Sequence, residues 1–364
     1  MSYKPAFING LGLVSAQKTL DPTSFLDEVV PPGPEYYKIQ EPNYKDFVAG
    51  DMVRRMSRII KMGISSAKMC LADGGWRKAD GGFDIPDAII TGTGLGCLED
   101  TEKFLATLIR NKEELLTPTS FIQSTHNTVS GQIALLLKCH SYNFTYCHRG
   151  FSFETALIDS LIRLRSGEAS TVLAGGMDEL TLNAFRITSR LGHWKRNPAG
   201  ITDLYSDNHR GSIAGEGAGF FLLSNQKTER SFANLLDIQT LYKPYGKEEI
   251  LEKITKLLAS HGMQLKDIDL FILGMNGDPA GDKPYHDLIH SLSPEANITA
   301  FKHLSGEFHT STIFALWLAS MIFRHSYVPE VVRKSGSFGR TVKNILIYNH
   351  YRNLEHTFTL VSTV

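Results

Sequence analysis

The residues of this chain with the most versatile chemistry are its four cysteines, Cys70, Cys97, Cys139 and Cys147. No two of them form a CxxC pair, and their wide spacing in 364 residues argues against a zinc site or a disulfide framework. We therefore expect free thiols in a reducing compartment. Cys147 lies between a predicted strand and a predicted helix, where a thiol can serve as a nucleophile if its pKa is lowered. The alternative is an ordinary, partly buried thiol at the end of a strand.

The segments around Cys147 alternate between strand and helix patterns. Apolar runs predict buried strands at 6–14, 87–91, 142–146, 171–176, 220–223, 270–273 and 345–348. Apolar residues at helical spacing predict helices at 54–71, through Phe104 and Leu108, and at 133–137, 153–164, 250–258 and 310–323. This alternation predicts an α/β fold with a largely parallel sheet covered on both faces.

A polar seam at 224–231 divides this pattern, and a similar order of elements begins again after it. We predict two α/β halves, 1–225 and 232–364, that share an architecture but no visible repeat in the letters.

Composition excludes several classes of protein. Hydrophobic residues make up 42% and charged residues 21%, as in ordinary globular proteins. The 38 basic and 38 acidic side chains give a net charge of zero, which argues against a nucleic-acid binder that neutralises many phosphates. The longest apolar stretch is too short to span a membrane, and no signal-peptide pattern begins the chain. We expect a cytoplasmic protein without a metal site.

Four segments in order resemble the β-ketoacyl synthases of the thiolase fold. They are the opening strand and turn at 7–15, Gly-Thr-Gly-Leu-Gly at 92–96, the helix end and strand at 164–178, and 203–219, which contains Gly-Glu-Gly-Ala-Gly. Each glycine motif alone would also fit a tight turn. Together the segments imply a thiolase-like five-layer αβαβα fold, built of two similar halves with mostly parallel sheets.

Members of that family join an acyl thioester to a malonyl unit held on acyl carrier protein. The resemblance implies a cysteine thiolate at a helix N-terminus, two neutral imidazoles and an oxyanion hole. Counting back without gaps from Gly175 and Gly176 places the nucleophile position at Gly150. Cys147 matches the family's Thr-Ala-Cys only if three residues are inserted.

The other catalytic positions of the family are also changed in this sequence. Asp278 stands at the position of the first histidine, in Asn-Gly-Asp. Glu307 stands at the position of the second, although Lys302 of the same pattern is retained. His303 and His309 flank this position and are candidates for recruitment or for hydrogen bonding at a helix start. The family's glycine-rich loop near the C-terminus is replaced by bulky residues at 349–355.

This combination resembles the chain-length-factor subunits, which are ketosynthase-like chains without the catalytic set. The segments 119–133 and 145–154 resemble the branch associated with aryl-polyene and flexirubin-type pigment clusters. We therefore predict a non-condensing subunit that pairs with an active ketosynthase as a heterodimer. It would shape the acyl tunnel of that partner in polyene, polyketide or fatty-acid-like biosynthesis.

Two alternatives remain open from the sequence. The chain could be a divergent, active β-ketoacyl synthase that uses Cys147. It could also be a homodimeric protein that binds acyl groups or carrier protein. In each case we expect no resident cofactor, because acyl chains would arrive on the phosphopantetheine arm of acyl carrier protein.

Several side chains are candidates for tunnel or partner contacts. Phe121, Phe151 and Phe153 would either line the tunnel or pack in the core. His148 and Arg149 would meet phosphopantetheine or a partner carboxylate, or form a surface salt bridge. The basic cluster of Arg54, Arg55, Arg58 and Lys61 would receive an acidic carrier protein, or form an ordinary solvated face.

Overall fold

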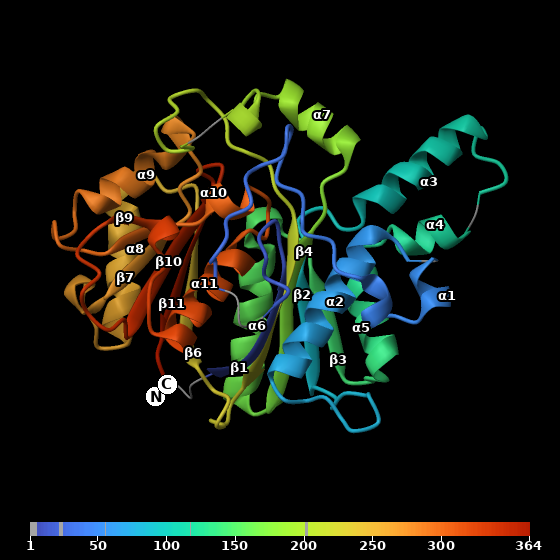
Figure 1. Ribbon diagram of the computed structural model, residues 1–364, viewed down its shortest axis with the longest axis horizontal. Helices are drawn as coiled ribbons and strands as arrows, with labels where there is room; N and C mark the ends of the chain where they lie inside the picture. The colour runs from blue at the N-terminus through green and yellow to red at the C-terminus, as the bar shows by residue number, and fades with distance from the viewer. Residues whose placement is uncertain (1–5, 22–24, 55, 117, 201–202) are drawn as a thin grey trace.

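Eleven strands form one sheet in the computed structural model of the chain, which describes residues 6–21, 25–54, 56–116, 118–200 and 203–364 (Figure 1). The strands are β1 (Ala6–Val14), β2 (Ala88–Gly92), β3 (Tyr142–Tyr146), β4 (Thr171–Asp178), β5 (Gly217–Ser224), β6 (Ala233–Tyr242), β7 (Leu270–Leu273), β8 (Ile298–Ala300), β9 (Arg333–Ser335), β10 (Asn344–Tyr351) and β11 (Glu355–Ser362). Their order across the sheet is β3-β2-β4-β5-β1-β6-β11-β10-β7-β8-β9.

The two halves of the chain repeat one strand topology. The first half has the order β3-β2-β4-β5-β1, and the second has the corresponding order β8-β7-β10-β11-β6. In each half the first two pairs of that order are parallel and the next two are antiparallel. The halves join where β1 and β6 pair over a few residues. This internal repeat supports the two similar halves predicted from the sequence, and the seam at 224–231 lies between β5 and β6.

The expectation of mostly parallel sheets is wrong in detail. Among the described strands, only β2–β3, β2–β4, β7–β8 and β7–β10 pair in parallel. The last two strands of each half are antiparallel neighbours, because β11 follows β10 through a tight hairpin and β5 returns beside β4. The sheet is therefore mixed.

Helices form layers on and between the half-sheets. They are α2 (Arg58–Asp73), α5 (Thr128–Leu137), α6 (Ser152–Ser166), α8 (Lys247–Ser260), α9 (Pro279–Ile289) and α11 (Thr312–His325). Figure 1 shows α8 and α9 on the left, α2 and α5 on the right, and α6 and α11 in the centre. Residues 312–322 of α11 are all buried, because this helix has protein on both sides.

The remaining helices lie at the edges of this framework. They are α1 (Gly50–Val53), α3 (Leu98–Arg110), α4 (Pro118–Gln123), α7 (Leu182–Arg190) and α10 (Lys302–Ser305), with short 3-10 turns at η1 (Tyr44–Asp46), η2 (Arg149–Phe151), η3 (Pro198–Gly200), η4 (Leu265–Asp267) and η5 (Glu330–Val332). Helices α3 and α4 project from the body as an arm, and α7 lies across the top (Figure 1). Within the described ranges, no helix is long and apolar enough to cross a membrane.

Candidate functional site

The junction between β3 and α6 contains both positions that the resemblance offered for the nucleophile, Cys147 and Gly150. Strand β3 ends at Tyr146, so Cys147 is the first residue after the strand. Helix α6 starts five positions later, at Ser152. Arg149 has a φ of 48°, which marks the sharp turn from strand to helix. Gly150 follows this turn directly.

No side chain fits at Gly150. A Cβ atom built there would lie 2.4 Å from Tyr351 Cβ and 2.8 Å from Glu355 Oε2. Tyr351 ends β10 and Glu355 begins β11, so both come from the hairpin that replaces the glycine-rich loop of the family. The hairpin thus occupies the space into which a nucleophile at position 150 would project.

The backbone N–H of Gly150 is also engaged. It donates a hydrogen bond to Glu355 Oε2 at 2.8 Å, and Glu355 is buried. A carboxylate is favourable there, because the first turn of α6 exposes N–H groups and the positive end of the helix dipole. While this bond is formed, the same N–H cannot stabilise the oxyanion of a substrate.

Cys147 lies outside this arrangement. Its thiol is exposed, and Sγ donates a hydrogen bond to Gly94 O at 3.5 Å. Partial burial raises the pKa of Cys147, and the negative charge of Asp178 adds to the shift. The thiol is therefore held protonated at neutral pH, which is the opposite of an activated nucleophile.

The two carboxylates at the histidine positions of the family lie together with the retained lysine. Glu307 Oε2 accepts hydrogen bonds from Lys302 Nζ at 2.6 Å and from Asn276 Nδ2 at 2.8 Å. Lys302 is fully buried, so its charge requires this partner. Asp278 is the N-cap residue of α9 and faces the same cavity as Glu307.

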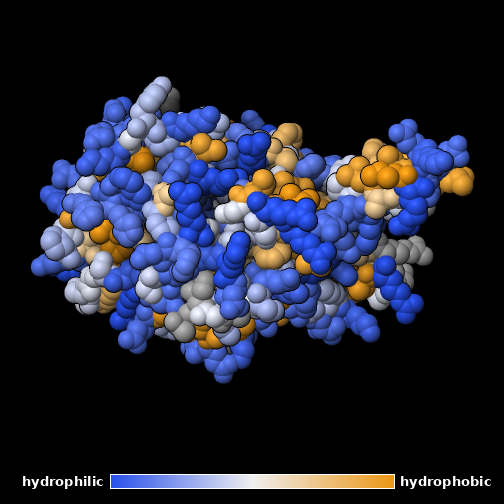
Figure 2. Space-filling model, turned by 90° about the horizontal axis from the view of Figure 1, so that it is seen from above, coloured by the Kyte–Doolittle hydropathy of each residue, from blue (hydrophilic) through white to orange (hydrophobic). Residues whose placement is uncertain are grey.

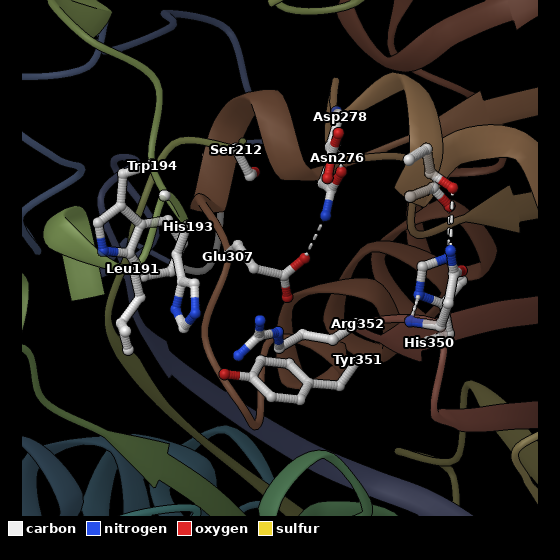
Figure 3. Close-up of a pocket in the computed structure, with 14 residues that line it drawn as sticks. Leu191, His193, Trp194, Ser212, Asn276, Asp278, Glu307, His350, Tyr351 and Arg352 are labelled. Atoms are coloured by element: carbon white, nitrogen blue, oxygen red, sulfur yellow. Dashed lines mark hydrogen bonds between the residues drawn. The ribbon is translucent and has the colours of Figure 1, made fainter. Parts of the chain in front are cut away.

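A cavity of about 280 Å³ lies between these groups and the β10–β11 hairpin (Figure 3). Its lining includes three residues that the sequence analysis did not name, His193, Trp194 and Ser212, together with Arg352. They come from the loop after α7, the segment before β5 and the hairpin turn. Ser212 lies within 203–219 and Arg352 within 349–355, two segments noted in the sequence, whereas His193 and Trp194 lie in no motif quoted for the resemblance.

The two histidines considered for recruitment are placed differently. His303 has both ring nitrogens engaged, Nδ1 with Tyr205 Oη at 2.8 Å and Nε2 with Val331 O at 3.0 Å. His309 packs against the Tyr351 ring, with centroids 4.4 Å apart. Among the described residues, neither histidine hydrogen-bonds to Cys147.

Asp178 holds the glycine turn after β2 to the second half of the chain. Its Oδ1 accepts from Gly94 N at 2.8 Å and Thr93 Oγ1 at 3.1 Å. Its Oδ2 accepts from the backbone N of Thr310 at 2.9 Å and from Thr310 Oγ1 at 2.8 Å. Four hydrogen bonds to one buried carboxylate fix the loops around the site.

The three candidate tunnel residues separate in the structure. Phe153 packs in the core beside Phe221, and Phe151 is also buried, edge-on to His148. These two fit the alternative of core packing, and neither lines the cavity. Phe121 lies on α4, where its side chain is 55% exposed and contacts Phe104. Only Phe121 is therefore available to a partner.

The basic candidates also differ from one another. His148, Arg149 and Arg54 are exposed, and Arg55 lies outside the described residues. Arg58 instead holds the buried Glu216 through two hydrogen bonds of 2.7 and 2.5 Å. It has the structural role of anchoring the Gly-Glu-Gly-Ala-Gly segment, which the sequence analysis missed.

The groups that the resemblance requires for thioester condensation do not stand at the positions that it assigns to them. Position 150 has no thiol, its N–H is occupied, and carboxylates stand at both histidine positions. In the part of the chain that the structure describes, no group of three or more His, Cys, Asp or Glu side chains is arranged to hold a metal ion. What remains is a polar cavity that can bind a small molecule.

Known structures share this architecture. The ishigamide ketosynthase/chain length factor is similar with a TM-score of 0.79 and 16% identity, covering 100% of both chains. The AntDE:AntF complex (apo), a type II PKS acyl-carrier protein with its ketosynthase bound to the hexaketide, has a TM-score of 0.75 and 16% identity, covering 99% of this chain. The fold is the thiolase-like α/β fold of ketosynthases.

The sequence comparisons identify the family. Residues 38–229 match the family described as "Beta-ketoacyl synthase, N-terminal domain". The 3-oxoacyl-(acyl-carrier-protein) synthase 2 of Rhizobium meliloti (strain 1021) is 24% identical over 194 residues, or 52% of this chain. The matched part spans about half the length of that relative, 46%. This chain belongs to the beta-ketoacyl synthase family.

The packing at Gly150 predicts the effect of restoring a cysteine there. Gly150→Cys should lower the free energy of unfolding by about 1–3 kcal/mol, because the new Cβ overlaps Tyr351 and overpacking has costs of this size. Chemical denaturation measures the loss. Gly150→Cys combined with Tyr351→Gly should recover part of it. A Gly150→Cys protein as stable as the wild type would contradict the described packing.

The buried imidazole of His303 predicts a loss of stability in acid. Burial lowers the pKa of His303 from 6.5 to about 4, and Lys334 adds to the shift. Below pH 6.5 the unfolded chain binds a proton that the folded chain excludes. The free energy of unfolding should therefore fall by up to about 1.4 kcal/mol per pH unit between pH 6.5 and 4.

His303→Gln should remove this contribution, measured by denaturation at pH 7 and pH 4.5. His290→Gln is the matched control, because His290 is exposed, and it should keep the full acid loss. An acid loss in His303→Gln equal to that of the wild type would show that His303 does not cause it.

Proposed function

We propose that this chain is a non-condensing member of its family, which pairs with an active ketosynthase and contributes to that partner's acyl tunnel. The observation that carries the proposal is the filled space at Gly150, where Tyr351 and Glu355 leave room for neither a thiolate nor an oxyanion. The raised pKa of Cys147 argues against the divergent enzyme that would use this thiol instead. Products of the aryl-polyene class remain part of the proposal through the resemblance alone.

A free sheet edge supports pairing with another subunit. Strand β3 stands at one end of the sheet and pairs on one side only, with β2. Its aromatic residue Phe144 is 45% exposed. Leu135 of α5 and Ile162 of α6, the helices that pack beside β3, are 65% and 57% exposed. An exposed apolar edge strand is a template for a strand of another chain.

The α3–α4 arm extends the apolar surface beyond this edge. Five of its large apolar side chains are exposed, Leu105, Ile109, Leu115, Phe121 and Ile122. Figure 2 shows hydrophobic atoms gathered on the projecting arm. Apolar side chains on a projecting segment are costly in water unless a partner covers them. Phe121 is therefore the candidate that could reach a partner's tunnel.

Carrier protein is the other proposed partner. His148 and Arg149 stand exposed beside the β3 edge and could contact a phosphopantetheine phosphate. The solved AntDE:AntF complex joins an acyl-carrier protein to its ketosynthase, and we extend such a contact to this chain as part of the proposal. No resident cofactor is proposed, since the acyl chain would arrive on the carrier. A cytoplasmic location remains a prediction.

The proposal predicts that the isolated chain does not condense acyl- and malonyl-carrier protein. Product formation followed by mass spectrometry should stay at background, because no activated thiol takes the acyl group. Cys147→Ala should behave like the wild type, alone and when mixed with an active ketosynthase. Turnover by the isolated chain that Cys147→Ala abolishes would overturn the proposal in favour of the divergent enzyme.

Pairing should depend on the edge strand. Phe144→Lys should reduce recovery of the complex with a co-expressed active ketosynthase from the same source by about tenfold or more, because a charge at an edge opposes strand addition. Gel filtration of the co-purified chains measures this loss. Tyr245→Lys is the matched control, since Tyr245 is fully exposed on the other half of the molecule.

A stable homodimer that excludes the ketosynthase would instead favour a homodimeric binding protein. In that case the chain alone would elute as a dimer, and co-expression would yield no mixed complex.

A further inference from the structure

The cavity beside the hairpin has more hydrogen-bond acceptors than the protein satisfies. Four of its lining residues carry a buried side-chain oxygen that receives no hydrogen bond from any described residue: Ser212 Oγ, Asp278 Oδ1, Glu307 Oε1 and Asn353 Oδ1. Ser212 is only 3% exposed and Glu307 only 6% exposed. Buried polar atoms are seldom left unpaired, so these oxygens point to a bound group that is a donor.

The charges of the lining residues indicate what kind of hydrogen-bond donor the cavity would bind. Asp278 and Glu307 both contribute carboxylates, and Lys302 engages only the other oxygen of Glu307, Oε2. Figure 3 shows the Glu307 carboxylate at the centre of the cavity, with Asn276 bonded to one oxygen. A protonated amine offers several N–H donors and a positive charge, which matches a lining that contains two carboxylates and a hydroxyl.

A positively charged side chain also lines the cavity. Arg352 is the only lysine or arginine among the described residues that line it, and its side chain is exposed. It stands in the hairpin turn with a φ of 57°, and Asn353 follows with a φ of 55°. A guanidinium binds carboxylates through two parallel hydrogen bonds. The cavity lining thus combines hydrogen-bond acceptors with a carboxylate-binding group.

We propose that this cavity binds a small zwitterionic amino acid, with its ammonium group at Ser212, Asp278 and Glu307 and its carboxylate at Arg352. A cavity of about 280 Å³ holds a compact molecule of this class. His193 and Trp194 form the wall beside it (Figure 3). The inference does not depend on whether the chain pairs with a ketosynthase, because all of these residues belong to one chain.

Binding is tested on the full chain by ligand-detected NMR and isothermal titration calorimetry. The probes are glycine, β-alanine and 4-aminobutyrate, with ethylamine and acetate as matched compounds that lack one of the two charges. At least one zwitterion should bind about tenfold more tightly than either single-charge compound. No binding of any zwitterion at about 10 mM would overturn the proposal and leave a cavity filled by water alone.

Two variants locate the ligand without disturbing buried ion pairs. Ser212→Ala removes an oxygen that has no partner, and Arg352→Gln changes an exposed side chain, so both should fold. Each should weaken zwitterion binding about fivefold or more, and Arg352→Gln should leave ethylamine binding unchanged. Glu307→Gln is less suitable, since it leaves Lys302 buried without its partner.

The matched control is Arg190→Gln, which changes an exposed arginine outside the cavity and should leave the affinity unaltered. Binding of zwitterions that is equal in the wild type, Ser212→Ala and Arg352→Gln would place the ligand elsewhere and overturn the proposal.

Discussion

The hydrogen bond between the Gly150 N–H and the Glu355 carboxylate is the contact on which the candidate site depends. It fastens the β10–β11 hairpin to the N-terminus of α6, where the helix favours a negative charge. With the hairpin in this position, Tyr351 covers Gly150 and closes one side of the cavity. In a ketosynthase the same N-terminus would serve a thiolate and an oxyanion. Here the Glu355 carboxylate of the same chain occupies the positive end of the helix.

Buried carboxylates stabilise the surrounding framework in a similar way. Asp178 ties the turn after β2 to Thr310 in the second half, and Glu216 is held by Arg58. Glu307 compensates the charge of Lys302. Because Asp178 and Glu216 have donors to both carboxylate oxygens and Glu307 has donors to one, the loops of both halves meet in a defined geometry. None of these contacts involves Cys147, so the loops around the candidate site are held without it.

The two proposals use different parts of the molecule. The edge strand β3 and the α3–α4 arm, on which the proposed pairing depends, contribute no residue to the cavity. The hairpin forms part of the cavity wall, and several lining residues carry a buried oxygen without a hydrogen-bond partner among the described residues. Fold and function are separable here, because function resides in a few side chains placed on a common framework.

Much of this was determined by the sequence. Hydrophobic periodicity predicted most of the strands and helices, and the glycine and acidic motifs led to the family and to Gly150, Asp278 and Glu307. Strands β6, β8, β9 and β11 were missed. Strands β8 and β9 have only three residues each, and polar residues such as Asp237 and Thr357 interrupt the apolar pattern of β6 and β11. Their burial depends on neighbouring strands, which local pattern does not report.

Only the tertiary structure decided how these residues act. Glu355 is 205 positions from Gly150, and no spacing rule connects them. The burial of Phe151 and Phe153, the engagement of Arg58 by Glu216 and the unpaired oxygens of the cavity likewise depend on segments that meet only in the folded chain. A sequence specifies which chemical groups are present. Packing decides which of them are neighbours, and therefore which are charged, covered or free to bind.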